Sequence, residues 1–449
     1  MSSELFHHAL KIDSDICIGC THCISVCPTQ ALRIKNGKAI LNSQRCVDCG
    51  ECYKECPVHA IKIEHDDFEE IFNYKYRVAL FPSVMISQFP SEFPPKQIYS
   101  TLLELGFTNV YEVEHSVDTL KKASNEYQKK HLGKKPLIST FCPAVVRLIQ
   151  VKYPSLIDKL LLLKPPFDLA AFYYKKKLML RGIKEEDIGI FYVTPCAAKI
   201  AAVKSPVGEN KSMINGVINL DSIYNKVLTL LKNNTNKNSC LISDSGSLSK
   251  TGVLWSLTKG EADNSIGRHL AIDGMRNVSE FLEKLENEEF KDLDFLELRA
   301  CDESCAGGVL TVSNRFLTVE RMKNRAKTLS NNKTDSKQKQ KILMDIIELE
   351  PVKPRSIDKL DDNIQKAMEK MEKKSLLIDT LPGFDCGACG APSCQALAED
   401  IVQDRAKINN CIFIQNAKLI NGYISKKEAQ IITEEIWGKE RINTEDDVE

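Results

Sequence analysis

Residues 17–28 read CIGCTHCISVCP, and residues 46–57 repeat the same spacing as CVDCGECYKECP. The stretch between them, ALRIKNGKAIL, places an Asn-Gly pair between two short apolar runs, which predicts a β-hairpin. Thiolates at this density select zinc or iron–sulfur clusters, and zinc sites rarely use four cysteines so close together. Residues 1–70 are therefore predicted to form a domain that holds two [4Fe-4S] clusters.

The spacing also predicts which thiols share a cluster, because the first three cysteines of one run join the fourth of the other. One cluster is predicted at Cys17, Cys20, Cys23 and Cys56, and the other at Cys27, Cys46, Cys49 and Cys52. This domain resembles the bacterial two-cluster ferredoxins. A pair of zinc knuckles is the alternative for the same cysteines.

The composition of the 449-residue chain excludes several classes of protein. Hydrophobic residues make up 43% and charged residues 27%, as in a globular protein. Lys+Arg and Asp+Glu number 61 each, so no net field favours nucleic acid or an anionic membrane. The chain shows no signal sequence and no apolar run long enough to span a membrane, so we expect a cytoplasmic location. Thiols stay reduced there, so the 17 cysteines argue for metal binding rather than disulfides.

Between residues 75 and 320, apolar strands alternate with amphipathic helices, as in YRVALFPSV, KQIYSTLLELGF and TNVYEVE. This alternation predicts an α/β fold with mostly parallel strands. The polar segment 327–341 lacks apolar periodicity and is predicted to be a surface linker. The predicted domains are therefore a ferredoxin domain at 1–70, an α/β domain at 71–326, a linker with helices at 327–375, and a small, mainly helical domain at 376–449.

The last domain carries its own cysteine set. Three cysteines lie in DCGACGAPSC and a fourth follows on a predicted helix: Cys386, Cys389, Cys394 and Cys411. Small residues between the thiols let backbone amides approach the sulfurs, which helps to set a reduction potential. The segment is similar to the four-cysteine [4Fe-4S] domains of Rnf-type electron-transport complexes and of corrinoid proteins. Zinc is the alternative metal.

The α/β region contains four dispersed cysteines. Cys142 lies in STFCPAVVRLI, Cys196 in VTPCAAK, and Cys301 and Cys305 in LRACDESCAGGV. These segments, in this order behind a ferredoxin repeat, resemble the three signature loops of the catalytic domain of [FeFe]-hydrogenases. The resemblance implies a two-lobed domain in which the four cysteines hold a cubane. It also implies that Cys305 bridges to a diiron unit that carries CO, cyanide and an azadithiolate.

The same resemblance implies roles for five further residues. Lys199 matches a lysine that hydrogen-bonds one cyanide, and Pro82 and Ser83 match a turn that contacts the other. Gly307 and Gly308 match glycines beside the last ligand, where a side chain would obstruct the cofactor. An ordinary surface lysine is the alternative for Lys199.

The chain departs from the active hydrogenases at the first loop. Those enzymes carry two consecutive cysteines there, and the first relays protons, whereas this chain has Phe141 at that position. Losing a positioned acid–base group typically costs about 10²–10⁴ in rate, so no catalytic residue is assigned. Thr194 and Arg299 stand where the family has methionines, and Phe81 replaces a small residue.

The chain keeps the cluster ligands but replaces the relay cysteine. This combination resembles the sensory class of [FeFe]-hydrogenases, whose members bind hydrogen and turn it over slowly. The implied function is slow oxidation or production of H2 in an oxygen-sensitive, anaerobic protein, for sensing or low-flux redox exchange. The implied partner is a redox protein, such as a ferredoxin or a dehydrogenase, or a signalling protein. The competing class is an electron carrier or scaffold without the diiron unit. Cys240 fits no set and is expected to be a buried structural thiol.

Overall fold

The computed structural model describes residues 6–233, 248–290, 292–331, 335–355 and 360–441. The chain forms two compact units, which are described separately. The smaller unit combines both ends of the chain, Met1–Cys46, Gly50–Ile63 and Arg355–Glu449, and the larger unit contains Val47–Cys49 and Glu64–Pro354. Cys240 lies outside the described residues. In the described part, no helix is long and apolar enough to cross a membrane.

The N-terminal part of the smaller unit is an internal repeat of short strands and helices. The strands are β1 (Leu10–Ile12), β2 (Leu32–Lys35), β3 (Lys38–Leu41) and β4 (Ile61–Ile63), and the helices are α1 (His22–Ser25) and α2 (Glu51–Glu55). Strands β1 and β4 pair antiparallel, and β2 and β3 form the predicted hairpin. The two residues of its turn, Asn36 and Gly37, have φ of 49° and 69°, as a two-residue hairpin turn requires.

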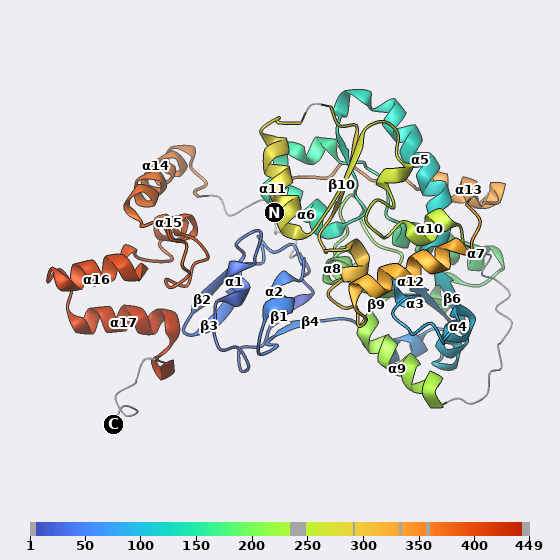
Figure 1. The fold of residues 1–449 in the computed structure, drawn as a ribbon, viewed down its shortest axis with the longest axis horizontal. Helices are drawn as coiled ribbons and strands as arrows, with labels where there is room; N and C mark the ends of the chain where they lie inside the picture. The colour runs from blue at the N-terminus through green and yellow to red at the C-terminus, as the bar shows by residue number, and fades with distance from the viewer. Residues whose placement is uncertain (1–5, 234–247, 291, 332–334, 356–359, 442–449) are drawn as a thin grey trace. The chain divides into compact units, whose positions relative to one another are not determined.

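The C-terminal part of the smaller unit is helical and packs on this hairpin. It consists of α14 (Ile364–Thr380), α15 (Cys394–Val402), α16 (Ile412–Ile420) and α17 (Lys426–Trp437), labelled in Figure 1. The amide of Ile34 donates to the carbonyl of Gly390 at 2.8 Å, and the amide of Gly37 donates to Ile436 at 2.9 Å. Arg33 also pairs with Asp400 at 2.5 Å. These bonds pair the edge of β2, which would otherwise expose free backbone groups.

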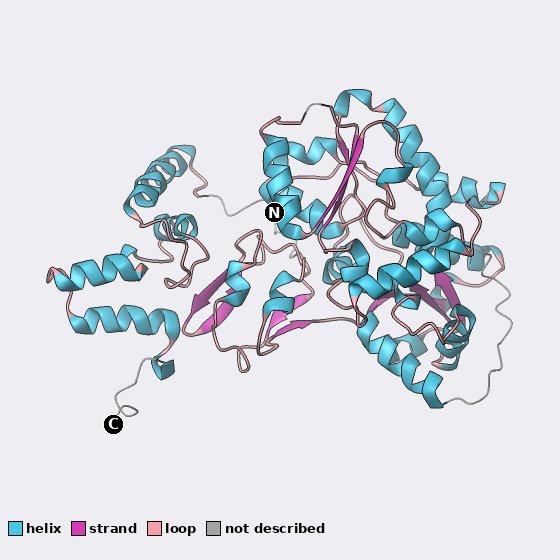
Figure 2. Ribbon diagram, viewed as in Figure 1, coloured by secondary structure: helices cyan, strands magenta, loops and turns pink. Residues whose placement is uncertain are grey.

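The larger unit contains two all-parallel sheets, coloured magenta among the cyan helices in Figure 2. The first sheet has the order β6-β5-β8-β9, formed by Asn109–Glu112, Tyr76–Phe81, Ile188–Thr194 and Gly216–Asn219. Every residue of β8 is buried, as expected for a central parallel strand. Helices α4 (Pro95–Glu104) and α9 (Leu220–Asn233) add Ile98 and Ile223 to its hydrophobic core.

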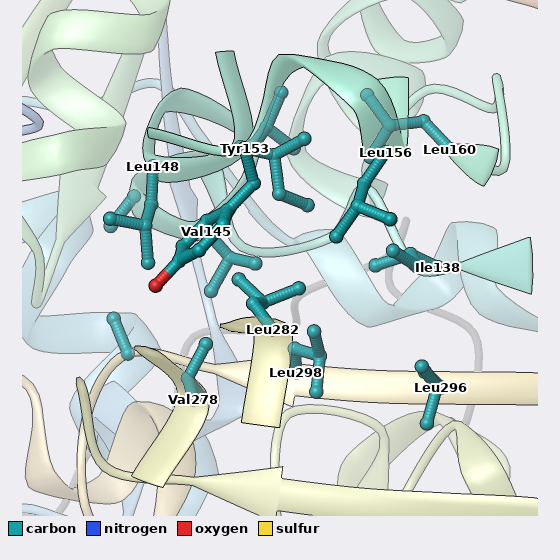
Figure 3. Packing of buried hydrophobic residues seen from close by; sticks show 14 of the residues in the cluster. Ile138, Val145, Leu148, Tyr153, Leu156, Leu160, Val278, Leu282, Leu296 and Leu298 are labelled. Atoms are coloured by element: carbon teal, nitrogen blue, oxygen red, sulfur yellow. The ribbon is translucent and has the colours of Figure 1, made fainter. Parts of the chain in front are cut away.

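The second sheet has the order β10-β11-β7, formed by His269–Asp273, Phe295–Arg299 and Leu137–Ile138. Figure 3 shows its core, in which Val145 and Leu148 of α6 (Pro143–Lys152) face Leu298 of β11 and Leu282 of α11 (Met275–Glu286). The predicted α/β class with parallel sheets, a ferredoxin-like domain and a helical C-terminal region is confirmed.

The remaining helices of the larger unit cover these sheets. They are α3 (Ser83–Ile86), α5 (Val117–Lys130), α7 (Pro166–Leu180), α8 (Ala197–Lys204), α10 (Lys250–Leu254), α12 (Arg315–Lys327) and α13 (Lys337–Met344). Most described residues of the segment expected to be a surface linker are exposed, but Asp335 and Lys339 are buried. Asp335 accepts from Thr119 at 2.7 Å and pairs with Lys339 at 2.7 Å. The segment reads as polar because its anchoring contacts are an ion pair and a hydrogen bond rather than an apolar stripe.

Candidate iron–sulfur centres

The four dispersed cysteines of the larger unit follow the carboxyl ends of parallel strands, where such folds place their ligand sites. Cys196 follows β8 directly and precedes α8, and Cys142 follows β7 and precedes α6. Cys301 follows β11, and Cys305 lies on the next short 3₁₀ turn, Ser304–Gly307. Two of the thiols therefore stand at helix N-termini, whose positive ends favour thiolate.

Lys199 interacts with three of these thiols. Its ammonium lies 3.7 Å from the Sγ of Cys305, and its charge also interacts with Cys196 and Cys142. Burial alone would lower the pKa of Lys199, but the neighbouring thiolates outweigh it and raise the pKa above its usual value. Since Lys199 is only 4% exposed, the alternative of an ordinary surface lysine does not hold.

The chemistry of this donor set fits a polycationic metal centre. Burial, followed by the charges of Cys142 and Cys305, raises the pKa of Cys196 to about 11, although Lys199 opposes this. Thiols with such a pKa carry a proton at neutral pH unless a metal displaces it. The site thus favours a group that supplies several positive charges to several thiolates.

A narrow cavity of about 10 Å³ lies beside Lys199. Its lining residues are Pro82, Val113, Glu114, Phe141, Pro166, Phe167, Tyr192, Lys199, Trp255 and Ser256. Ser256 also connects the cavity to the cysteine loop, because its carbonyl accepts from the amide of Cys305 at 3.2 Å. Of the predicted cofactor contacts, Pro82 and Lys199 line the cavity directly.

Four buried polar atoms on the wall of this cavity have no hydrogen-bond partner among the described residues. They are Glu114 Oε2, Tyr192 OH, Trp255 Nε1 and Ser256 Oγ. Leaving such a group without a partner costs about 1–3 kcal/mol, so several around one cavity indicate a polar ligand. Three of them can donate, which suits ligands that accept hydrogen bonds, such as cyanide.

Phe141 lies in the cavity wall, held between two cations. The guanidinium of Arg299 stands 3.9 Å from the centre of its ring, and the ammonium of Lys199 stands 5.0 Å from it. Arg299 is buried and pairs with Glu261 at 2.9 Å. The side chain at the first-loop position is therefore an apolar ring that stabilises two buried positive charges.

Three other sequence positions have structural explanations. Thr194 is buried, and its hydroxyl accepts from the amide of Cys196 at 3.2 Å, so it orients that thiol. Phe81 packs in the core of the first sheet against Tyr99, with ring centres 5.8 Å apart. Ser83 lies behind the cavity, donating from its amide to Glu114 at 2.9 Å and from its hydroxyl to Glu112 at 2.7 Å.

The two glycines beside Cys305 allow a close approach of the protein backbone. A Cβ on Gly307 would lie 1.9 Å from the carbonyl oxygen of Asp302, and one on Gly308 would lie 2.5 Å from that of Pro195. Neither glycine lines the cavity described above. The obstruction is therefore with the protein backbone, whose close approach shapes the cysteine loop.

Behind Ser83 lies a group of buried charges that the sequence did not mark as a site. Burial, and then the charge of Glu112, raises the pKa of Glu114 to about 8. Burial would also raise the pKa of Glu112, but the guanidinium of Arg325, at 2.6 Å, holds it below its usual value. Glu114 is thus protonated at neutral pH and Glu112 is ionised.

In the ferredoxin-like domain, one predicted cluster set is recovered as a group. Burial, and then the charges of Cys17, Cys20 and Cys56, raises the pKa of Cys23 to about 12. The fourth cysteine of the second run therefore lies beside the first three of the first run, as predicted. Backbone amides point at the sulfurs: Ala39 donates to Cys17 at 3.4 Å and Ala60 to Cys56 at 3.2 Å.

The structure places the other set of this domain as follows. The sulfur of Cys27 accepts from the amide of Ala31 at 3.1 Å. Cys46 and Cys52 are buried, and Cys49 belongs to the three-residue turn that groups with the larger unit.

The C-terminal cysteines also converge. Burial raises the pKa of Cys389 to about 11, with smaller contributions from the charges of Cys386 and Cys411. Cys394 is the first residue of α15 and packs in the same hydrophobic cluster as Cys389 and Cys411. Its amide donates to Asp385 at 2.6 Å, which fixes the turn before the helix.

Family matches cover the first and last cysteine regions and, of the middle region, Cys142 and Cys196. The family described as iron only hydrogenase large subunit, C-terminal domain, matches residues 77–225. The 4Fe-4S dicluster domain matches residues 9–68, and an Fe-S cluster family matches residues 381–413. Over residues 77–225 the chain is similar to [FeFe]-hydrogenases. Its N-terminal part is similar to 4Fe-4S dicluster ferredoxin domains, and its C-terminal part is similar to an Fe-S cluster domain.

Individual relatives of this hydrogenase-like protein match it less closely. Ferredoxin-2 of Desulfomicrobium norvegicum is 46% identical over 33 residues, a stretch that covers 7% of this chain and 56% of that ferredoxin. A variant of [FeFe]-hydrogenase HydA1 from Chlamydomonas reinhardtii has a TM-score of 0.47 and 16% identity, covering 62% of this chain and 94% of that one. The structure of HydA(deltaEFG), reported for stepwise H-cluster assembly, has a TM-score of 0.47 and 15% identity. The match covers 65% of this chain and 97% of that one.

The residues of the hydrogenase-like site that the sequence did not reveal are mostly aromatic or acidic. Tyr192 lies inside an apolar strand, and Trp255 and Ser256 follow α10 in a segment without a motif. Glu114 comes from the segment TNVYEVE, which was read only as a strand. Its position near the end of a parallel strand was the one available signal, since such ends meet at ligand sites.

Proposed function

We propose that this protein binds H2 and slowly oxidises or produces it at a hydrogenase-type centre, serving hydrogen sensing or low-flux redox exchange. Cys142, Cys196, Cys301 and Cys305 would hold a cubane, and Cys305 would also hold a diiron unit. The observation that carries the proposal is the cavity beside Cys305, which is lined by Lys199 and by four polar atoms without partners. A domain that held only a cubane would have no use for these groups.

The remaining cysteines would hold three further cubanes, which makes four in all. Cys17, Cys20, Cys23 and Cys56 would bind one, Cys27, Cys46, Cys49 and Cys52 the second, and Cys386, Cys389, Cys394 and Cys411 the third. All 16 described cysteines are free of disulfides, in keeping with the reducing, anaerobic cytoplasm that the proposal includes.

When bound, the diiron unit supplies the position at which H2 splits into two protons and two electrons. The chain's own groups would hold and orient it. Lys199 would donate a charged hydrogen bond to the cofactor, and Tyr192, Trp255 and Ser256 would offer neutral donors. Pro82 and Ser83 fix the opposite wall, since the Ser83 amide and hydroxyl are anchored to Glu114 and Glu112.

Proton transfer at this site would be slow. Phe141 presents a ring without an ionisable proton where an acid–base group would be needed. Glu114 is the protonated carboxyl on the cavity wall, and its Oε2 has no partner in the described residues, so it can hold a proton there. The expected rate lies about 10²–10⁴ below that of a site with a positioned relay.

The test is reconstitution of the purified protein with the diiron cofactor, followed by infrared spectroscopy. Terminal CO and cyanide bands are expected, with about eighteen irons per chain against about sixteen for four cubanes alone. The matched variant Lys199→Met should weaken or shift the cyanide bands while the cubanes remain. A fully loaded cubane protein without these bands would exclude the proposal and leave an electron carrier or scaffold.

A further inference from the structure

An apolar patch is exposed on the C-terminal part of the smaller unit. Phe384 is 66% exposed, Phe413 is 46% exposed and Ile412 is 41% exposed. The rings of Phe384 and Phe413 contact each other edge to face, with centres 5.1 Å apart. Because they come from two separate segments, the contact makes one continuous surface, which we call the phenylalanine patch.

The phenylalanine patch flanks the C-terminal cysteine centre. Phe384 lies two residues before Cys386, and Ile412 and Phe413 directly follow Cys411. Cys386 is itself exposed, whereas Cys411 is buried. Both neighbour Cys389, as described above, so the two segments that carry the patch also carry two of its thiols. The centre therefore reaches the surface of the protein within the patch.

The opposite side of the same centre faces the ferredoxin-like domain. Gly387 lies between Cys386 and Cys389, and a Cβ there would be 3.6 Å from the Cδ1 atom of Ile24, which is ordinary contact. Ile24 is buried and follows Cys23 directly in the sequence. The C-terminal centre thus stands between solvent on one side and the first ferredoxin cysteine set on the other.

We propose that the phenylalanine patch is the docking surface for a small iron–sulfur electron-carrier protein. The inference rests on the proposed cluster at these cysteines and adds the place where electrons enter or leave the chain. Each encounter transfers one electron: the carrier loses one and this protein gains one, or the reverse, and no bond forms or breaks. Small contact areas are typical of such transient redox complexes.

The apolar character of the patch distinguishes it from a charged docking site. Exposed apolar groups that gather in one place mark interaction sites, whereas scattered ones do not. Burying a phenylalanine side chain contributes about 1.5–3 kcal/mol, which corresponds to about 10–100-fold in affinity. Since this contribution is not electrostatic, the complex should weaken only slightly when salt is added.

The experiment titrates the cluster-loaded full-length protein with an oxidised bacterial two-cluster ferredoxin and measures Kd by calorimetry. Phe384→Ser and Phe413→Ser should each raise Kd at least about 10-fold. The matched control is Phe316→Ser, which changes a phenylalanine that is 57% exposed on the larger unit and should leave Kd unchanged. Electron paramagnetic resonance of the reduced variants should show the same clusters as the unaltered protein.

Three outcomes overturn the inference. One is an unchanged Kd for the Phe384→Ser, Phe413→Ser double variant with its clusters intact, and another is no binding by the unaltered protein. The third is self-association in sedimentation experiments that the double variant abolishes, which would make a second copy the occupant. Absence of the C-terminal cluster signal from the unaltered protein would instead contradict the proposed cluster itself. The experiment therefore distinguishes failure of the docking proposal from failure of the cluster assignment.

Discussion

The cysteine centres of the two units differ in what surrounds the thiols. In the ferredoxin-like domain the sulfurs accept from backbone amides, those of Ala31, Ala39 and Ala60, and within residues 6–63 no buried side-chain polar atom lacks a partner. Around Cys305 the neighbours are side chains: a buried lysine, an arginine stacked on Phe141, and four polar atoms without partners.

This difference separates electron transfer from bond chemistry. A centre that only exchanges electrons needs a fixed potential, which amide hydrogen bonds and burial provide. A centre that binds a small molecule needs groups that act on the ligand itself, and these must be side chains held ready in advance. Under the proposed function, the larger unit would carry the second kind of site and the smaller unit the first.

The strongest test of the contrast removes one ligand from each kind of centre. Cys305→Ala should lower iron by about six atoms per chain and reduce H2 turnover below detection, because the cubane and the diiron unit would share that thiol. Cys389→Ala should lower iron by about four atoms but keep the CO and cyanide bands. Iron analysis and infrared spectroscopy measure both, and loss of the bands from Cys389→Ala would contradict the separation.

The next test concerns Phe141. Phe141→Cys should raise H2 turnover by about 10²–10⁴ by placing an ionisable thiol in the cavity wall. The control Phe141→Ala opens the same space without a thiol and should give no rise. Turnover is measured by gas chromatography on reconstituted protein, and an equal rise in both variants would mean that access, not proton transfer, limits the rate.

A smaller effect, on stability, is expected at Gly37, where the backbone of the smaller unit is closely packed. Gly37 has φ of +69°, and a Cβ there would lie 2.6 Å from the carbonyl oxygen of Trp437. Gly37→Ala should therefore destabilise the smaller unit by about 1–3 kcal/mol in chemical unfolding. Gly422→Ala is the matched control, since it has φ of +71° and nothing within 4 Å. Equal losses would show that strain, rather than the clash with Trp437, accounts for the cost.

A dependence of stability on pH should also appear. The pKa of Glu114 is raised to about 8 from 4.5, so the folded protein binds a proton there more tightly than the unfolded chain. The contribution of Glu114 to the free energy of unfolding should then be fully present below about pH 4.5 and be lost as the pH rises to about 8. Glu114→Gln should flatten the fall in Tm across this window. A wild-type slope in the variant would assign the dependence to other groups.

Much of the fold could be predicted because its signals are local. The two cysteine runs, the Asn-Gly turn and the apolar strands each lie within a dozen residues, and the ligand set Cys17, Cys20, Cys23 and Cys56 follows from spacing alone. Lys199 and Pro82 came from the family resemblance, and the structure brings both to the cavity.

The rest depends on contacts that no local pattern encodes. Tyr192 looks like any buried strand residue, and Trp255 has no periodic context, yet both line the cavity. Asp335 and Lys339 form a buried ion pair within a polar segment, and its sequence gives no sign of that contact. Gly307 and Gly308 accommodate backbone oxygens of Asp302 and Pro195, and these contacts can be seen only in three dimensions.

The pairing of the β2–β3 hairpin with the C-terminal region has a consequence for synthesis. The amide of Ile34 pairs with the carbonyl of Gly390, which is synthesised more than three hundred residues later. At about 5–20 residues per second, the ribosome needs tens of seconds to reach it. During that interval the edge of β2 is open to other strands, so the nascent chain depends on chaperones, or on early cluster insertion, until its tail emerges.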